Sequence, residues 1–487
     1  MAVGSSLTKR PWSDEGWFAA PAYNLLVHGS MGTLVLEENG WLPGINQHTY
    51  WIMPLHLVAQ TAWYKLFGFS LFSLRALSTF WGLVALAAWF VIVRSIWDNR
   101  SVALLTITLL AIDYNFVMGA SFGRMDLMCA ALGFAGLAAY LRLRESHLQT
   151  AVLVSHSFIA ASGLTHFNGI MPFISLIFLT FYFDRTRIKW RHVAIAAIPY
   201  LIGVTGWGVY ILQSPSDFLA QFKGNANDNN RLALLTAPWK AFAREVTGRY
   251  LQGYGLGRHS DGVTPLVILK SLVLLAYVVG VIGFICARDI RRHQGWRPVI
   301  IVTAIYFVIL TILDGQKLTF YLVHIIPFYV AMLAVWIRWC WEKRMMPRWM
   351  ITLGVVGLVA LQLGGVVQRI AMKEYQKGHL PAVKFLQGSS NQQALVFGCA
   401  DLGFDLGFDG RLIDDRSLGF YTGKRPDFIV VEAAYEDAFN GSIRRTPIYQ
   451  HITTLMNEQY HQVYDQGSYR IYARNKSIAG PLKGSDR

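Results

Sequence analysis

An adjacent pair of carboxylates, Asp14 and Glu15, stands near the start of the chain, between Trp12 and Trp17. A carboxylate that is ionised near neutral pH can take a proton from a hydroxyl group, and two carboxylates can hold a cation. Tryptophan is enriched where a protein meets the membrane–water boundary. The same two acids would also suit the first turn of a helix, where they cap backbone N–H groups and oppose the helix dipole. The pair alone therefore leaves a chemical and a structural interpretation open.

Other polar residues fall at the ends of apolar segments that are far apart in the sequence. Acids and bases gathered at the edge of a membrane would form a pocket suited to a substrate that carries phosphate. We expect this pocket to be lined by His48, Tyr50, His56, Arg124, Asp126, His166, Asn168, Lys317, Tyr321 and His324. Each has a structural alternative: Arg124 and Asp126 would pair with each other, His166 would satisfy a broken helix, and Lys317 would extend its ammonium group to the interface. The basic residues of 231–259 would belong to a lid or to a solvated loop.

The segments that position these residues have the composition of membrane-spanning helices. The chain is 54% hydrophobic and only 15% charged, and its apolar segments reach the roughly 20 residues that cross a bilayer. Helices of a soluble protein would be amphipathic instead. We predict spans at 74–96, 101–119, 125–142, 150–166, 169–183, 193–212, 264–287, 298–314, 318–339 and 349–369.

Lysine and arginine collect in every second gap between these spans, which identifies those gaps as cytoplasmic loops. The net charge of +15 is therefore topogenic and does not indicate nucleic-acid binding. The other gaps, including the long segment 213–263, would face outside, as would residues 1–73 and the tail from about 370. Both ends of the chain then lie outside although residues 1–12 contain no signal peptide, so we expect an upstream eleventh span and a cytoplasmic N-terminus.

The predicted fold class is an all-α polytopic membrane protein with outer interfacial helices and a small α/β domain at its C-terminus. Residues 50–67, and similarly 16–29, predict helices in the outer interface. In the tail, helices are expected at 380–386 and 448–458 and strands at 394–397, 428–431 and 469–472. The expected parts are an outer segment (1–73), a membrane domain (74–369) and an α/β domain (370–487). The four cysteines indicate neither a disulfide framework nor a zinc site.

In this order, the motifs resemble those of the C-type superfamily of membrane glycosyltransferases, particularly bacterial relatives of protein O-mannosyltransferases and of the lipid A aminoarabinose transferase. The motifs that carry the resemblance lie at 13–17, 53–56, 63–68, 75–77, 124–126, 163–169 and 317–321, followed by Pro327. Two positions depart from the pattern, because Met53 precedes Pro54 where the aminoarabinose branch has a lysine, and His166 stands where a lysine is frequent.

The resemblance implies transfer of a sugar, with inversion, from a polyprenyl-phosphate carrier to a lipid, glycan or protein acceptor outside the plasma (inner) membrane. Asp14 would be the general base, and Glu15 would position the acceptor or ligate a divalent cation. No cofactor is firmly implied, and we assign no metal site. The donor phosphate would be contacted by Lys317, Arg124, His48 and His56.

Two other functional classes stay open at this point. A transporter or lipid flippase would also place polar residues on apolar spans, although such sites usually lie at the bilayer midplane and between internal repeats. An assembly subunit of the cell envelope would use the tail to bind a partner, and it would tolerate the loss of Asp14.

Overall fold

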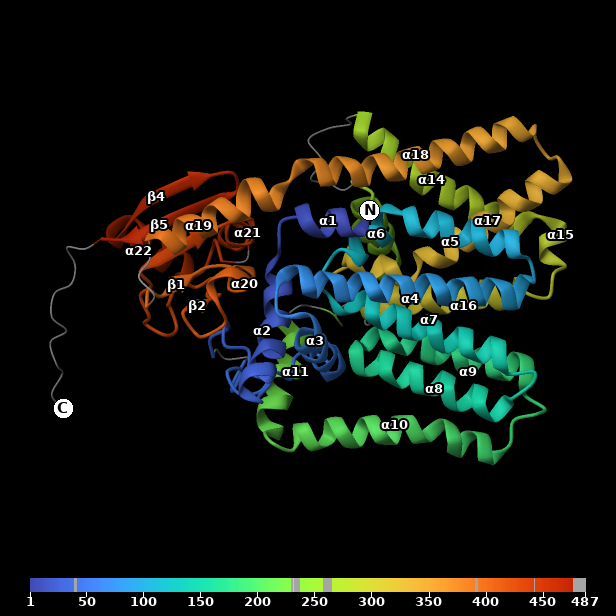
Figure 1. Ribbon diagram of the computed structural model, residues 1–487, viewed down its shortest axis with the longest axis horizontal. Helices are drawn as coiled ribbons and strands as arrows, with labels where there is room; N and C mark the ends of the chain where they lie inside the picture. Colours follow the sequence, from blue (N-terminus) through green and yellow to red (C-terminus); the bar gives the residue numbers. More distant parts are fainter. Residues whose placement is uncertain are drawn as a thin grey trace. The chain divides into compact units, whose positions relative to one another are not determined.

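The computed structural model describes residues 1–38, 42–228, 231, 237–256, 265–389, 393–441 and 443–475. The chain forms two compact units (Figure 1). The first, which we call the membrane unit, contains residues 1–6, 50–59 and 75–371. The second, the α/β unit, contains residues 7–49, 60–74 and 372–487. Residues 1–73 are thus divided between the two units.

The membrane unit consists of long apolar helices. In the described part of the chain, 8 helical segments are long and apolar enough to cross a membrane. They correspond to α4 (Leu71–Trp97), α7 (Met125–Leu143), α8 (Leu148–Thr165), η1 with α9 (Phe167–Gly169, Ile170–Asp184), α10 (Trp190–Ile211), α14 (Pro265–Cys286), α16 (Trp296–Leu313) and α18 (Arg348–Met372). The predicted multi-pass α-helical fold is confirmed.

Two further predicted spans are not straight helices. The span expected at 101–119 is broken at Asp113 into α5 (Arg100–Ile112) and α6 (Tyr114–Ala120), which are bent by 67°. The span expected at 318–339 begins as a 3-10 helix, η3 (Thr319–His324), and α17 follows only at Ile326–Lys343. Hydropathy could not show the bend or the 3-10 start, because it reports the apolar character of a segment and not its hydrogen-bond pattern.

Helix α10 shows most directly that the surroundings of this unit are apolar. None of its most apolar stretch is buried inside the protein, and Leu201, Ile202 and Val204 are each at least 65% exposed. An exposed apolar face of this size would be unstable in water, whereas lipid chains cover it without cost. The chain is therefore a multi-pass membrane protein.

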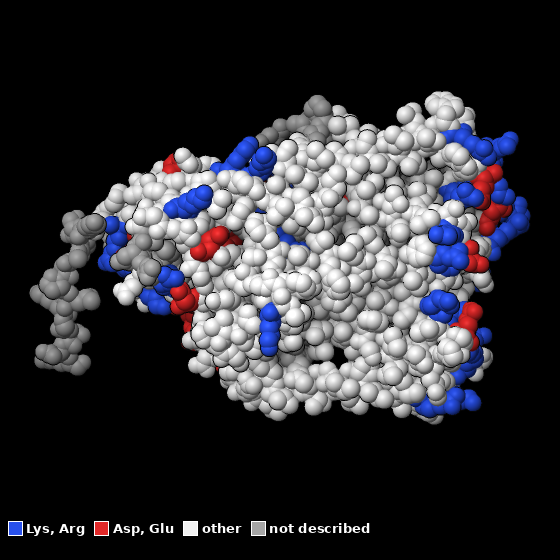
Figure 2. Space-filling model, viewed as in Figure 1, with Lys and Arg blue, Asp and Glu red and all other residues white. Residues whose placement is uncertain are grey.

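Charged residues are confined to the ends of these helices. Figure 2 shows lysine and arginine gathered over the end of the membrane unit that carries α15 (Arg288–Arg291). The loops predicted to be basic all lie at that end of their helices, as in the turns after α4, α7, α9 and α17. The polar residues singled out in the sequence lie at the opposite ends, for example at the start of α7 and the end of α8.

The segment 213–263, predicted to be an outer loop, is largely helical where it is described. It contains α11 (Pro215–Asp228), α12 (Pro238–Arg244), the π-helix η2 (Glu245–Tyr250) and α13 (Leu251–Gly253). The remaining helices before the tail are α1 (Ala2–Thr8), α2 (Ser13–His28) and α3 (Pro54–Phe67), which covers the expected interfacial helix.

The α/β unit is built on a five-stranded sheet in the order β2-β1-β3-β5-β4. Strands β1 (Val396–Phe397), β2 (Leu412–Ile413) and β3 (Phe428–Val431) are parallel, and β4 (Tyr460–Gln466) and β5 (Tyr469–Arg474) complete the sheet in antiparallel pairing. The sheet is accompanied by η4 (Tyr375–His379), α19 (Leu380–Ser389), η5 (Ala400–Leu402), α20 (Gly403–Leu406), α21 (Ala433–Asn440) and α22 (Pro447–Gln459). The three predicted strands and two predicted helices are present. Helix α2, which includes part of the interfacial helix expected at 16–29, packs Ala19, Ala20 and Ala22 into the core of this unit.

Candidate active site

A buried network of four charges organises one end of the membrane unit. Arg249, on η2, lies 2.5 Å from Glu245 through its Nε and 2.9 Å from Asp314 through a terminal nitrogen. The other oxygen of Glu245 lies 3.0 Å from the Lys317 ammonium. Their side chains are at most 7% exposed. Two cations are therefore balanced by two carboxylates, as burial of charge requires.

The network fixes the loop that joins α16 to η3. Asp314 accepts hydrogen bonds from the backbone N–H groups of Gln316 and Leu318, and Arg249 donates to the Leu318 carbonyl. Lys317 adopts a left-handed backbone conformation (φ 60°) and donates to the carbonyl of Thr311. Burial lowers the pKa of Lys317, and the neighbouring Glu245 opposes this shift. The loop holds the start of η3 rigidly in place.

This geometry favours a structural role for Lys317. Its ammonium group is bonded to Glu245 and to a backbone carbonyl, and only 1% of its side chain is exposed. Glu245 and Arg249 were not singled out in the sequence, where 231–259 was considered a lid or a solvated loop. Their spacing of four residues on one helix face was the available signal, but the same spacing is common on exposed helices.

Arg124 and Asp126, at the start of α7, pair with each other, as one interpretation of the sequence held. Nε of Arg124 lies 2.7 Å from an Asp126 oxygen, and its guanidinium group covers the Phe320 ring at 4.6 Å. The second oxygen of Asp126 is buried and accepts no hydrogen bond from the described residues. This unsatisfied oxygen is a position where a bound hydroxyl or ammonium group would be stabilised.

Four polar side chains from the broken helix pair and η3 come together. The backbone N–H of Asn168 donates to Nδ1 of His166, and Nε2 of His166 lies 3.3 Å from the Tyr321 hydroxyl. The Asn168 side chain lies 3.4 Å from Nε2 of His324. In a neutral His166, Nδ1 is thus the acceptor and Nε2 carries the proton, which it donates to Tyr321. The structure therefore brings together His166, Asn168, Tyr321 and His324, as predicted.

Arg231 is a member of this cluster that the sequence did not single out individually. A terminal nitrogen lies 3.5 Å from the Tyr321 hydroxyl, and its carbonyl accepts a hydrogen bond from Gly315 in the loop after α16. Its Nε is buried without a hydrogen-bond partner, and among the described residues it forms no ion pair. With donors from Arg231 and His166 directed at the Tyr321 oxygen, the Tyr321 proton must point to a third group. Arg231 and Tyr321 together offer donors to an anion.

The other predicted residues are placed as follows. His56, on α3, is buried, and burial lowers its pKa to about 4 although Asp126 opposes the shift. Tyr50 is held by α10 and α11, because its hydroxyl donates to the carbonyl of Tyr210 and its backbone N–H donates to Gln221. His48 belongs to the α/β unit.

The acidic pair also belongs to the α/β unit, and its two members differ. Glu15 is fully buried, and its carboxylate accepts a hydrogen bond of 3.2 Å from the backbone N–H of Trp12. The capping interpretation therefore fits Glu15. Asp14 is partly exposed at the first turn of α2. Of the pair, Asp14 is the carboxylate that a substrate can reach.

Within the described ranges, no group of three His, Cys, Asp or Glu side chains is arranged to hold a metal ion. That the protein has no metal site stays a prediction.

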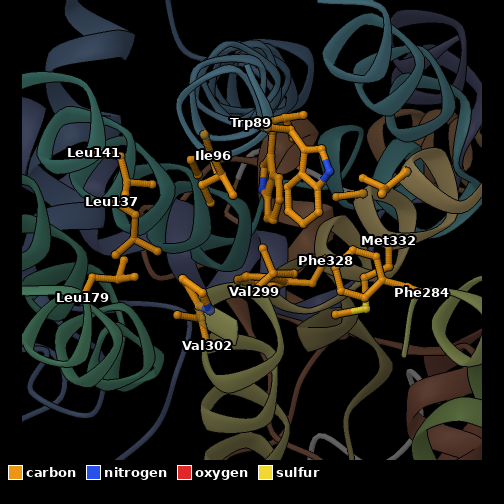
Figure 3. A pocket seen from close by; sticks show the side chains of 16 residues that line it. Trp89, Ile96, Leu137, Leu141, Leu179, Phe284, Val299, Val302, Phe328 and Met332 are labelled. Carbon is orange, nitrogen blue, oxygen red and sulfur yellow. The ribbon is translucent and has the colours of Figure 1, made fainter. Parts of the chain in front are cut away.

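A cavity inside the membrane unit has a different character (Figure 3). It measures about 40 Å³ and is lined only by apolar and aromatic side chains, among them Trp89, Leu137, Phe284 and Phe328. That volume suits about one water molecule. Neither its size nor its lining fits a sugar phosphate.

No family model matches the chain, and no curated protein matches it in sequence. Solved structures match over nearly its whole length, and the fold of this chain is similar to theirs. ArnT from Cupriavidus metallidurans bound to undecaprenyl phosphate matches at TM-score 0.62 and 15% identity, covering 99% of this chain and 97% of ArnT. The oligosaccharyltransferase AglB from Archaeoglobus fulgidus, in complex with an inhibitory peptide and a dolichol-phosphate, matches at TM-score 0.52 and 12% identity. That match covers 96% of this chain and 71% of AglB.

Replacing Glu245 with alanine is expected to destabilise the membrane unit strongly. The change leaves Arg249 and Lys317 as neighbouring buried cations, and breaking a buried pair costs about 3–5 kcal/mol. The thermal unfolding midpoint in detergent should fall by several degrees. Glu145→Ala, which removes an exposed partner of Arg144, should leave the midpoint within about 1 °C. Equal midpoints for the two variants would contradict the structural role of the network.

A buried neutral histidine predicts a loss of stability in acid. Burial lowers the pKa of His56 to about 4, whereas an unfolded histidine titrates near pH ~6.5. As the pH falls from about 7 to 4, the unfolded chain takes up a proton that the folded chain does not, so stability decreases. The variant His56→Gln should show a flatter dependence of the unfolding midpoint on pH. The exposed His461, changed to glutamine, serves as the control and should leave the dependence unaltered.

Proposed function

We propose that the protein is a glycosyltransferase that takes a sugar from a polyprenyl-phosphate donor and transfers it, with inversion, to a hydroxyl acceptor. The single observation that carries the proposal is Arg231, a cation without an acidic partner among the described residues, directed at Tyr321 in a polar cluster of a membrane protein. The fold supports it, because the matching structures are glycosyltransferases and one of them is bound to undecaprenyl phosphate.

The charge balance of the reaction explains why such a cation is needed. The acceptor oxygen bonds to the anomeric carbon and gives its proton to a base, while the bond between that carbon and the phosphate oxygen breaks. The electron pair stays on the phosphate, which changes from a monoanionic diester to a dianionic monoester. Arg249, Lys317 and Arg124 are already balanced by Glu245, Asp314 and Asp126. We therefore assign to Arg231 the role of stabilising the additional negative charge on the leaving phosphate, with Tyr321 as a further hydrogen-bond donor.

Asp14 is assigned the role of the base. It is the partly exposed member of the acidic pair, whereas Glu15 is buried. An ionised carboxylate within about 3 Å of the acceptor hydroxyl can accept its proton as attack proceeds. Glu15 caps α2 and supports this position.

The ends of the helices support an outer location for the polar cluster. The cluster lies at the ends of α7, α8 and α9 that are opposite to the basic loops, and basic loops favour the cytoplasmic side. We therefore place the reaction on the outer face of a plasma membrane, with a lipid, a glycan or a protein as acceptor. A position at helix ends is less typical of a transporter, whose sites usually lie near the midplane.

Asp14→Asn should abolish transfer without removing donor binding. Loss of a general base typically lowers the rate about 10²- to 10⁴-fold. The assay measures the transfer of radiolabelled sugar from a set of polyprenyl-phosphate sugars to the acceptors in membranes that contain the wild-type or variant protein at matched expression. Wild-type protein that transfers no sugar from any donor, or Asp14→Asn protein that transfers at the wild-type rate, would overturn the proposed function in favour of a transporter or an assembly subunit.

Arg231→Gln should lower kcat about 10²- to 10³-fold, as loss of a donor to a developing anion does. Arg231→Lys keeps the charge without the planar fork and should retain part of the activity. Arg244→Gln is the matched control, because Arg244 is an exposed arginine of the same segment. The Arg244→Gln variant should keep the wild-type kcat. If the Arg231→Gln variant has the same kcat as this control, Arg231 does not stabilise the leaving phosphate.

A further inference from the structure

The carboxyl ends of the three parallel strands in the α/β unit meet at one edge of the sheet. Acidic residues follow each strand there: Asp401 lies after β1, Asp414 and Asp415 directly follow β2, and Glu432 directly follows β3. All four are at most 8% exposed. In open α/β sheets this edge is the usual place where a ligand binds.

In this chain the edge is occupied by the segment that carries the acidic pair. The indole N–H of Trp17 donates to an Asp414 oxygen at 2.9 Å. Arg10 lies 3.5 Å from Glu432. The N-terminal segment thus provides a hydrogen bond and an ion pair to the ends of two different strands.

Gly16 brings α2 against the backbone of the same edge. A Cβ atom at Gly16 would lie 2.3 Å from both the carbonyl carbon and the oxygen of Ala400, which is too close for any side chain. The backbone N–H of Ala400 donates to the same Asp414 oxygen that accepts from Trp17. One carboxylate therefore joins α2 to the turn that follows β1.

The indole of Trp17 is fixed on its face as well as at its N–H. The guanidinium group of Arg416 lies over the ring at 5.2 Å, and its Nε is 3.8 Å from the other Asp414 oxygen. A ring that is bonded at its N–H and covered by a cation has little rotational freedom. Because Trp17 lies three residues after Asp14 on α2, one helical turn connects the fixed ring to the carboxylate.

We infer that the C-terminal α/β unit serves the transfer reaction by holding the helix that carries Asp14, with Gly16, Trp17 and Asp414 as positioning residues. The inference rests on the proposed function of Asp14. The sheet edge that would otherwise bind a ligand is filled by the chain itself, so the unit acts as the support of the base. Small displacements of a catalytic group lower the rate far more than they lower binding.

Two single variants remove the same hydrogen bond from opposite sides. Trp17→Phe keeps an aromatic ring and loses the N–H donor, and Asp414→Ala removes the acceptor. Each should lower kcat about 10- to 100-fold while the KM for the donor stays within about twofold. The double variant should be no slower than the slower single variant, because both act through one contact. Lys424→Ala is the control, because Lys424 and Glu37 form an exposed pair that also joins the N-terminal segment to the tail.

Hydrogen exchange tests the same contact without an activity assay. In Trp17→Phe and Asp414→Ala, peptides covering residues 13–24 should exchange at least tenfold faster than in the wild type, while peptides of α7 stay unchanged. If the Asp414→Ala variant fails to fold, the Trp17→Phe variant alone tests the positioning role. Wild-type kcat in Trp17→Phe, or unchanged exchange over α2, overturns the positioning role even when Asp14→Asn is inactive. A loss confined to the amount of folded protein, with kcat per donor-binding protein unchanged, also overturns it. A wild-type protein without transfer activity would contradict the proposed function. Hydrogen exchange over α2 would then still show whether the contact between Trp17 and Asp414 fixes the helix.

Discussion

The carboxylate of Glu245 is the group on which the membrane unit's polar end depends. It lies against both Arg249 and Lys317, and Arg249 in turn contacts Asp314 and the Leu318 carbonyl in the loop before η3. Without this single acid, two buried positive charges would repel each other in surroundings of low dielectric constant. The position of Tyr321 follows from it, because η3 begins where that loop ends. The polar end of the membrane unit is thus built on neutralised charge.

Under the proposed function, the same neutralisation explains how the site would select a ligand by its charge. A cation that already has an acidic partner offers little to an incoming phosphate, because binding would compete with the existing pair. Arg231 differs from Arg124 and Arg249 in this respect among the described residues. Neutral histidines around it, such as His166, provide hydrogen bonds without adding charge. The arrangement suits a ligand that gains one negative charge during reaction better than one that is merely anionic throughout.

Much of the fold could be predicted because hydropathy and positive charge act over long, regular segments. The spans around α4 and α14 follow from apolar length alone, whereas the bend at Asp113 and the 3-10 start at Thr319 depend on hydrogen bonds that hydropathy does not report. In the candidate site, the sequence placed both His166 and Tyr321 at the outer ends of spans, and the structure brings their side chains into contact. The sequence could not show that Lys317 is neutralised by Glu245, since the partner lies in a segment that reads as an outer loop. Two-residue strands such as β2 leave no periodic pattern to detect.

The contact between Trp17 and Asp414 joins residues 397 positions apart in the chain. A ribosome completes the first of them early and the second only near the end of synthesis. Throughout that interval, helix α2 lacks the sheet edge against which Gly16 and Trp17 pack. Contacts of such long sequence separation form late, because the entropy of closing the chain is lost before they contribute. Helix α2 is therefore expected to acquire a fixed position late in folding. A chain that ends before Asp414 would contain Asp14 and Glu15 but would lack the contact that positions their helix.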